Sequence, residues 1–493
     1  MSASSIERRA RRAEVGLRAR LFSIADDARW LRDSIGGLGR ELPVFGNLRS
    51  GSWYVPPDVS AGACYFKSTD GHAYGPMGFS MTRLNLSLAS VAARAGGAVV
   101  VDATSSGAKR FPDSFNTIAI WCAVLNAIVM PGRSGVPSLA SFFPRWQPPS
   151  VAAIAMDVVT RTVAELPNDL AMTIRAELPH LTRPLVPVFV CQPPSSLRQT
   201  ESASDSAWED SLWPLLDNGS DGDTLPIVCV SVSRIVDEGG DVRSATAGFH
   251  YVSGAGDDAE FWAQRVGLSP EHFWAHVDKF LETSTESECV EVARALSTRE
   301  SSLSSVGDAP RRDAADRSLS FWSALVGSSV RIGESSIYVA TADTWDVAVR
   351  STDATAAAEL VLPSLIFFVR ASEGPGPEFS FSVIASGSFP VVEISAPTTK
   401  RSLIDSRHGW QNILLPAIKA ALCGERVVIA FELAQSAAVA ATVAAAAILR
   451  CSASRFDKSA VRTALALTCA ACKAPSVDRA LFKELTTFFS AKN

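Results

Sequence analysis

Short apolar strands that alternate with helical segments are the feature that most constrains this chain. Val99-Val100-Val101 directly precedes Asp102, and the hydrophobic run over residues 118–130 that follows has the length of a helix. Further strand-like runs occupy 186–190 and 227–232. Strands joined by helical crossovers form parallel or mixed sheets that helices cover. The sequence therefore predicts an α/β fold.

The same alternation returns beyond a Ser-rich, charged stretch over residues 297–317, which reads as a linker. A chain of 493 residues is also too long for one compact core. We therefore expect two α/β regions that meet near residues 330–360. The expected strands lie at 337–340, 365–369, 379–385, 391–394 and 427–431, and the expected helices at 410–422, 436–449, 460–472 and 477–489.

Composition excludes several classes of protein. Nine cysteines, an odd number scattered along the chain, fit a reducing compartment rather than a disulfide framework. The Ala-rich stretch over 433–449 is shorter than a membrane span needs, and the Arg-rich N-terminus lacks the apolar segment of a secretory signal. We expect a soluble cytoplasmic protein with no membrane partner and no obligate protein partner.

Six arginines crowd the first half of an amphipathic helix predicted over residues 5–35. Cations this close repel one another unless an anion is near. Contact with RNA phosphates is therefore slightly favoured over a solvated surface. Residues 201–330, by contrast, hold 23 acidic and 9 basic side chains, which disfavours a polyanion there. The arginines are Arg8, Arg9, Arg11, Arg12, Arg18 and Arg20.

A polar run that follows the strand-like residues 64–66 is the first candidate site. It combines a cation, two hydroxyls, a carboxylate, a glycine and an imidazole. Hydroxyls and backbone N–H groups suit phosphate oxygens, and the lysine supplies charge. A capped turn is the alternative, although it would need only one of these side chains. The run is Lys67, Ser68, Thr69, Asp70, Gly71 and His72, and Arg83 and Asn85 follow at the start of the next predicted helix.

The loop after the strand over 98–101 is the second candidate. An acid is followed by small hydroxyl residues and a glycine, which let backbone amides converge on a phosphate, and then by two cations. Enzymes that use phosphoribosyl pyrophosphate often have such a loop, in which the acid holds ribose hydroxyls or a magnesium ion. A surface turn explains the pattern about equally well. The residues are Asp102, Thr104, Ser105, Ser106, Gly107, Lys109 and Arg110.

Two other loops are weaker candidates. The loop over 251–260 holds three acids that could bind Mg²⁺, but adjacent acids are more typical of a helix N-terminus. The loop over 430–437 follows a strand, as in phosphatases of the cysteine class, but contains neither Cys nor Arg. Because that chemistry needs a thiolate, it is excluded at this loop.

Several of these motifs resemble the initiator tRNA phosphoribosyl transferases of fungi and plants. The resemblance covers most of the chain. It implies an N-terminal catalytic region over 1–340 and a C-terminal domain over 341–493 that is similar to dual-specificity phosphatases. The motifs that carry it are Cys64–His72, Arg83–Leu86, Val101-Asp102, Lys109-Arg110, Ile120–Asn126 and Pro270–Trp274.

The resemblance also implies an activity. Members of the family transfer 5-phosphoribose from phosphoribosyl pyrophosphate to the ribose 2′-hydroxyl of adenosine 64 in initiator methionine tRNA, which excludes that tRNA from elongation. Mg²⁺ is expected with the donor, and Asp102 is the expected ligand. A base must lie within about 3 Å of the hydroxyl. We favour Asp70 as this base, with His72 orienting it or binding a donor phosphate, and the reverse assignment stays open.

The chain departs from the family in two loops, and also at Asn116, where a Ser/Lys pair is expected, and at Ala259, where a His is expected. Residues 105–108 are neutral where family members carry more cations, and the family's C-terminal phosphate loop appears as Ile429–Ser436, in which Gln435 and Ser436 remain as polar groups. The alternative hypothesis is therefore a phosphate- or RNA-binding relative of the family with lost or altered turnover.

Overall fold

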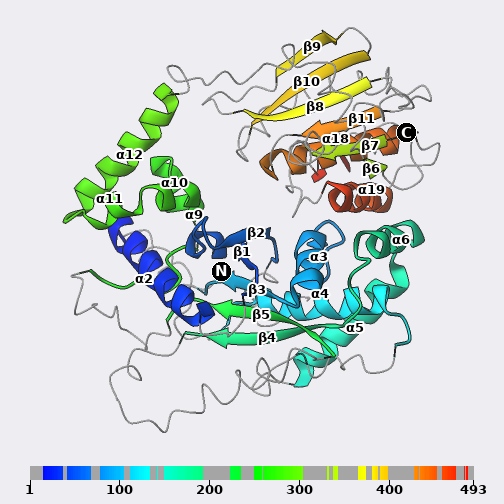
Figure 1. Cartoon of the computed structure of the whole chain (residues 1–493), viewed down its shortest axis with the longest axis horizontal. Helices are drawn as coiled ribbons and strands as arrows, with labels where there is room; N and C mark the ends of the chain where they lie inside the picture. Colours follow the sequence, from blue (N-terminus) through cyan, green and yellow to red (C-terminus); the bar gives the residue numbers. More distant parts are fainter. Residues whose placement is uncertain are drawn as a thin grey trace. The chain divides into compact units, whose positions relative to one another are not determined.

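The chain divides into two compact units in the computed structural model (Figure 1). One unit comprises Met1–Phe79, Ser87–Glu165 and Leu178–Ser302, and the other comprises Ser80–Leu86, Leu166–Glu177 and Leu303–Asn493. The structure describes residues 15–36, 41–67, 78–104, 111–133, 142, 149–192, 223–234, 249–257, 259–303, 330–331, 337–341, 365–372, 380–386, 389–397, 427–431, 434–451, 458–472, 482–483 and 485–486.

The first unit is built on a five-stranded parallel sheet. Its strand order is β2-β1-β3-β5-β4, and every neighbouring pair is parallel. The three central strands are wholly buried and rich in valine, as expected for strands that helices cover on both faces. The strands are β1 (Val44–Asn47), β2 (Ser60–Cys64), β3 (Ala98–Asp102), β4 (Leu185–Cys191) and β5 (Leu225–Ser231).

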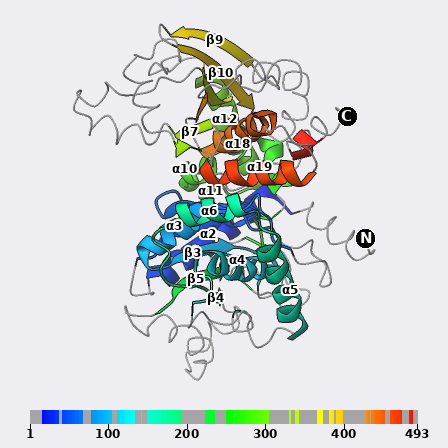
Figure 2. The same ribbon diagram turned by 90° about the vertical axis from the view of Figure 1, so that its right-hand side faces the viewer.

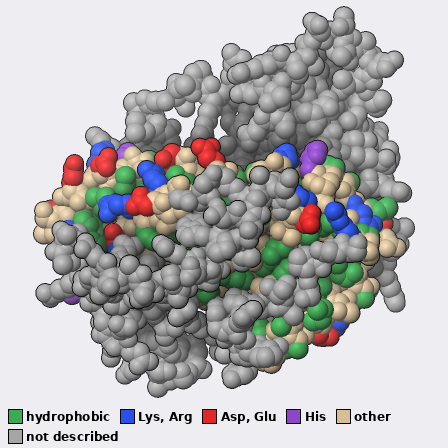
Figure 3. All heavy atoms as spheres, turned by 60° about the horizontal axis from the view of Figure 1, so that its bottom comes forward, with side chains coloured by type: hydrophobic (Ala, Val, Ile, Leu, Met, Phe, Trp, Pro, Cys, Tyr) green, Lys and Arg blue, Asp and Glu red, His purple; other side chains and the backbone are tan. Residues whose placement is uncertain are grey.

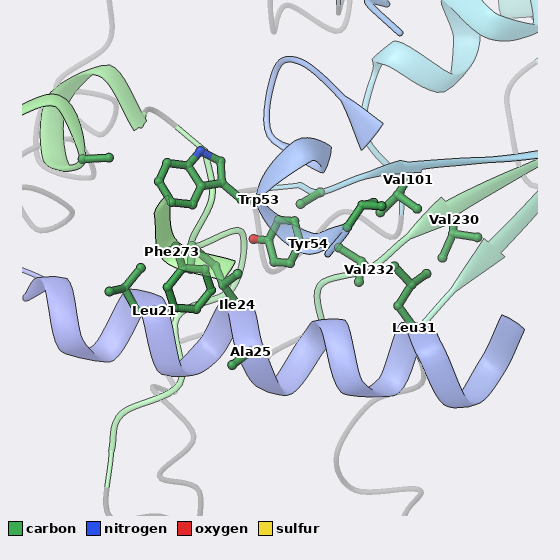
Figure 4. Close-up of a cluster of buried hydrophobic side chains, with 14 of the residues drawn as sticks. Leu21, Ile24, Ala25, Leu31, Trp53, Tyr54, Val101, Val230, Val232 and Phe273 are labelled. Atoms are coloured by element: carbon green, nitrogen blue, oxygen red, sulfur yellow. The ribbon is translucent and has the colours of Figure 1, made fainter. Parts of the chain in front are cut away.

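Helix α2 (Leu17–Gly36) lies against one face of this sheet. Figure 4 shows Leu21, Ile24 and Leu31 on the side of α2 that faces Tyr54 and the sheet. Full burial of one such aliphatic side chain stabilises a fold by about 1.5–3 kcal/mol. This packing therefore fixes the position of α2. Alternate strand residues complete the cluster, namely Val99, Val101, Val228, Val230 and Val232.

Helix α4 (Ser114–Val129) belongs to the other face of the sheet. Its Asn126 donates from Nδ2 to Leu185 O at 2.9 Å and accepts from Leu185 N at 2.8 Å, which joins the helix to the start of β4. Trp121 packs edge-on against Phe66 with ring centroids 5.3 Å apart. The unit is thus a sheet between two helical layers. The other helices of this unit that precede β4 are η1 (Gly51–Tyr54), α3 (Leu86–Ala95) and α5 (Pro149–Glu165). Helix α6 (Asn168–Glu177) lies between α5 and β4 in the chain but belongs to the second unit.

A group of helices follows β5 and packs beside α2. Phe273, Phe280 and Cys289 from these helices join the same buried cluster as α2. Glu286 accepts hydrogen bonds from the backbone N–H groups of Leu17 and Arg18 and so caps the start of α2. The helices are α9 (Ala259–Trp262), η4 (Gln264–Val266), α10 (Pro270–Ala275), α11 (Val277–Leu281) and α12 (Glu286–Leu303).

The second unit contains a six-stranded mixed sheet of order β6-β7-β11-β8-β10-β9, in which only the two outer pairs are antiparallel. Helices α18 and α19 pack side by side (Figure 2), and α6 packs on α19. The boundary expected at 340/341 falls inside β7. The elements are β6 (Val330–Arg331), β7 (Ile337–Thr341), β8 (Leu365–Ser372), β9 (Ser380–Ser386), β10 (Phe389–Pro397), β11 (Val427–Phe431), α18 (Ala434–Cys451) and α19 (Lys458–Ala471).

The α/β class expected from the sequence is confirmed in both units. Two strands were not predicted, β1 and the two-residue β6, because such short segments show no clear period. The strand expected at 64–66 was misplaced, since β2 occupies Ser60–Cys64 and shares only Cys64 with it. The helix predicted over 5–35 is observed from Leu17 onward. Its first residues lie outside the described part of the chain, as does the helix expected over 410–422.

A candidate site at the switch point of the parallel sheet

The carboxyl ends of β1 and β3 form the candidate site. These strands are neighbours, yet the next strand after β1 in the chain, β2, lies on the other side of β1. The chain thus adds β2 on one side of β1 and β3 on the other, so the order of strands reverses between β1 and β3. In open parallel sheets, ligands bind in the crevice beside such a switch point. Asn47 ends β1 and Asp102 ends β3.

Asp102 is the centre of a buried polar network. One carboxylate oxygen accepts hydrogen bonds from Ser50 Oγ at 2.6 Å and from Ala103 N at 2.9 Å. The other accepts from Asn47 Nδ2 at 2.8 Å and from Ser114 Oγ. Asp102 thus joins the end of β1, the loop before η1 and the first turn of α4.

The electrostatic state of Asp102 results from opposing effects. Burial raises the pKa of its carboxyl above the ordinary value, and the positive charge of Arg49, with the hydrogen bonds from Ser114, Ser50 and Asn47, offsets part of the increase. Arg49 is partly exposed and also lies 3.4 Å from Asp257. Arg49 therefore links the switch point to the loop after residue 250.

The network bears directly on the expected metal. A carboxylate offers about four lone-pair positions, and the four donors occupy them. In this arrangement Asp102 can bind neither Mg²⁺ nor a ribose hydroxyl directly unless one of the four donors is displaced. No cluster of three or more His, Cys, Asp or Glu side chains that could hold a metal occurs in the described ranges.

A glycine allows η1 to approach β3 this closely. A Cβ atom on Gly51 would overlap the carbonyl oxygen of Val101. Only a residue without a side chain fits there, and the approach brings the neighbouring Ser50 to Asp102.

Besides Asp102, the structure describes four of the predicted donor-site residues. Lys67 is exposed, and its carbonyl accepts from Thr117 Oγ1 of α4 at 3.0 Å. Thr104 is buried just after Asp102. Arg83 and Asn85 belong to the second unit, where Asn85 Nδ2 donates to Arg83 O at 3.2 Å. The predicted residues outside the described part of the chain are Ser68, Thr69, Asp70, His72, Ser105, Ser106, Gly107, Lys109 and Arg110.

Arg18 and Arg20 have structural contacts of their own. Arg20 is only 5% exposed, and its guanidinium donates to Ala255 O at 3.1 Å. It is therefore unavailable to an external phosphate in this arrangement, which corrects its expected role in tRNA binding. Arg18 Nε donates to Thr283 O at 2.8 Å. The other predicted arginines, Arg8, Arg9, Arg11 and Arg12, lie outside the described residues.

The described surface shows no single basic stripe on the face drawn in Figure 3. Lys and Arg side chains are interspersed there with Asp and Glu. A surface of mixed sign gives little long-range attraction for a polyanion. The described part of this face therefore offers no candidate tRNA contact beyond the predicted N-terminal arginines.

The acidic loop after residue 250 is part of the core. Tyr251 donates to Asp27 of α2, with both carboxylate oxygens 2.9 Å away, and Tyr54 accepts from Gly256 N at 2.8 Å. Asp257 is mostly buried and faces Arg49. The described part of the loop thus anchors α2 and η1, and its pairing with Arg49 accounts for Asp257 without Mg²⁺. The side chains of the other two acids, Asp258 and Glu260, lie outside the described part of the structure.

The C-terminal candidates are Gln435 and Ser436. They are the second and third residues of α18, the helix that follows the central strand β11. The backbone therefore places both in a first helical turn, where unpaired N–H groups favour an anion.

Sequence reasoning missed Asn47, Ser50 and Ser114. The available signal was weak, namely an asparagine that closes the short apolar segment Val44–Asn47 and a serine that opens the helix after Asp113. Their importance arises only because β1 and β3 are neighbours.

The fold and the site together define an α/β protein of the open parallel-sheet type, with polar side chains gathered at its switch point. The chain belongs to the family whose model is described as "Rit1 N-terminal domain", which matches residues 10–298. No helix in the described ranges is both long enough and apolar enough to cross a membrane.

Two curated relatives support this assignment. The tRNA A64-2′-O-ribosylphosphate transferase of Saccharomyces cerevisiae is 32% identical over 287 residues, which cover 56% of this chain and 53% of the relative. An uncharacterized protein of Schizosaccharomyces pombe is 33% identical over 266 residues, 53% of this chain and 52% of its own. The chain thus spans about half the length of the curated relatives it matches. No solved structure matches it significantly.

Proposed function

We propose that this chain is a glycosyltransferase that transfers 5-phosphoribose from phosphoribosyl pyrophosphate to the 2′-hydroxyl of an adenosine in tRNA. The observation that supports it best is the match to the Rit1 family over residues 10–298, which include all five strands of the parallel sheet. The name of the S. cerevisiae relative describes a ribosylphosphate transfer to tRNA A64.

The chemistry proposed for the site is a displacement at C1 of the donor ribose. The bond between C1 and the pyrophosphate oxygen breaks, a bond forms between C1 and the acceptor 2′-oxygen, and pyrophosphate leaves. The hydroxyl proton passes to a base, for which Asp70 and His72 remain the predicted candidates. Lys67 would balance charge on the leaving pyrophosphate, and its exposure next to the switch point supports this role.

Asp102 is proposed to position this site rather than to react. Its bonds to Ser50 and Ser114 hold the loop before η1 and the start of α4 on either side of the switch point. Direct binding of Mg²⁺ by Asp102 stays a prediction that would require one of these donors to move. We propose initiator methionine tRNA as the acceptor and the cytoplasm as the place of reaction.

The second unit is proposed to be a phosphatase-like domain without phosphatase chemistry. Support comes from a central parallel strand, β11, followed by helix α18, with Gln435 and Ser436 in the first turn of that helix. Such a turn could hold a phosphate of the tRNA or of the donor.

The test is to incubate the full chain with total tRNA and phosphoribosyl pyrophosphate labelled in its ribose. Label should appear in one tRNA species and map to the 2′-oxygen of A64. Label in no tRNA, with tRNA binding retained, would instead support the RNA-binding relative that has lost turnover.

A pair of variants tests the proposed base. Asp70→Asn keeps hydrogen-bonding capacity but removes the charge, so transfer should fall by about 10²-fold or more if Asp70 is the base. The matched control is Asp58→Asn, because Asp58 is an exposed carboxylate paired with Arg32, and its transfer rate should equal that of the wild type. Normal turnover of Asp70→Asn would move the search to His72.

A further inference from the structure

Two buried polar side chains at the carboxyl edge of the first sheet have no hydrogen-bond partner among the described residues. Gln192 follows β4, and both its amide nitrogen and its amide oxygen are unpaired, while Ser231 ends β5 with an unpaired hydroxyl. Both residues are fully buried. Gln192 N donates to Ser231 O at 3.1 Å, so the two side chains start from adjacent backbone positions.

The described polar side chains around the ends of β1 and β3 are paired within the protein. Asn47, Ser50 and Ser114 all bond to Asp102. Buried amides and hydroxyls without partners cost free energy, and native proteins seldom leave them so. A group outside the described residues therefore completes this part of the edge, and a water molecule and part of a ligand are the two candidates.

The position favours a ligand over a water molecule alone. Ser231 is the register partner of Asp102 on the neighbouring strand, and adjacent strands lie about 4.8 Å apart. The unpaired groups thus lie beside the switch point, at the edge where parallel sheets bind their ligands.

We propose that Gln192 and Ser231 bind the vicinal hydroxyl pair of the donor ribose, an inference that rests on the proposed function. The amide oxygen can accept from one hydroxyl while the amide N–H₂ donates to the other, and Ser231 can do either. Uncharged groups suit an uncharged ligand in a buried place. An internal tRNA nucleotide has its 3′-oxygen esterified, so the free diol belongs to the donor.

The sequence suggested Asp102 for the ribose contact. We assign this contact instead to its neighbours Gln192 and Ser231. Asp102 has its acceptor positions filled, whereas Gln192 and Ser231 have theirs open. Arg234, the described cation that follows β5, is paired with Asp26. A phosphate is therefore the poorer candidate for this subsite.

The test compares binding of ribose 5-phosphate and 2-deoxyribose 5-phosphate to the full chain. The wild type should prefer the ribose form by about tenfold, the factor that one hydrogen bond of ordinary strength provides. The preference should approach unity in Gln192→Met and in Ser231→Ala. Neither variant should lower the melting temperature, because neither side chain has a partner to lose.

Ser233→Ala is the matched control. Its hydroxyl accepts from Gly254 N at 3.1 Å, so the variant should melt lower yet keep the preference for the ribose form. Variants at 192 and 231 that keep the full preference would overturn the inference and leave a buried water as the partner. So would a large loss of stability in both, since it would reveal protein partners.

The same experiment separates this inference from the proposed function. A wild type that labels tRNA, while Gln192→Met and Ser231→Ala retain the preference, refutes only the ribose subsite. A wild type that binds neither sugar phosphate nor phosphoribosyl pyrophosphate refutes both. Loss of preference in the variants with labelling in the wild type supports both.

Discussion

At the scale of single residues, burial gives Asp102 a different role from the one that its sequence motif suggests. In the sequence it is an acid at a strand end, a usual position for a ligand contact. In the structure it accepts four hydrogen bonds from four other residues and is fully buried. Its main effect is therefore to hold backbone segments together.

Asp102→Ala should be strongly destabilising. The substitution leaves Asn47, Ser50, Ser114 and the N–H of Ala103 without their acceptor, at about 1–3 kcal/mol for each donor that stays buried and unpaired. Urea unfolding measures the loss. Asp58→Ala removes an exposed carboxylate and should change the free energy of unfolding by less than about 1 kcal/mol. Equal stability of the Asp102→Ala protein would show that the carboxylate is free for a ligand.

At the scale of elements, η1 and α2 are held by contacts distant in sequence. The loop before η1 reaches β3 because Gly51 has no side chain. Helix α2 is anchored through Asp27 to Tyr251 and through Arg20 to Ala255. Each element therefore depends on partners that no local pattern reveals.

Gly51→Ala should disturb the switch point without touching a polar group. The new methyl would overlap Val101 O and push Ser50 away from Asp102, at a cost of about 1–3 kcal/mol, as for other overpacked sites. Gly36→Ala meets nothing within 4 Å at the end of α2 and serves as the control. Melting curves of both proteins decide the matter, and a Gly51→Ala protein as stable as the control would contradict the close approach.

The arginines around α2 should separate into two groups. Replacing Arg8, Arg9, Arg11 and Arg12 by Ala should weaken binding to all tRNAs alike and lower the salt dependence of binding, since phosphate contacts carry no sequence information. Arg20→Met should instead lower the melting temperature and leave the salt dependence unchanged, because Arg20 is buried. Filter binding over a range of salt concentrations measures the slope. An unchanged slope in the fourfold variant would make the segment purely structural.

At the scale of the whole molecule, the division into units does not follow the order of the chain. Helix α6 lies between α5 and β4 in sequence, yet it belongs to the second unit and packs on α19. Leu170 and Ile174 of α6 are fully buried. Each unit thus requires segments from both halves of the sequence.

A fragment of residues 1–302 should fold around the parallel sheet but expose the apolar side of α6. It should bind a hydrophobic dye, and Leu170→Ser with Ile174→Ser should reduce that binding. Ile154→Ser with Met156→Ser on α5 is the control, because those side chains are already 50% and 44% exposed. A fragment that fails to unfold cooperatively would show that the sheet needs the second unit.

The sequence by itself determined the local elements of this protein. The valine run that forms β3, the acid that ends it and the alternation of strands with helices follow from side-chain period and propensity, which act over a few residues. The motifs also sufficed to indicate the family and the chemistry expected of it. Only the tertiary structure decided which elements meet. The pairing of β1 with β3 brought Asn47 and Ser50 to Asp102, packing against the loop after residue 250 buried Arg20, and α6 joined the second unit, because contacts between distant segments depend on how whole surfaces fit and leave no local pattern.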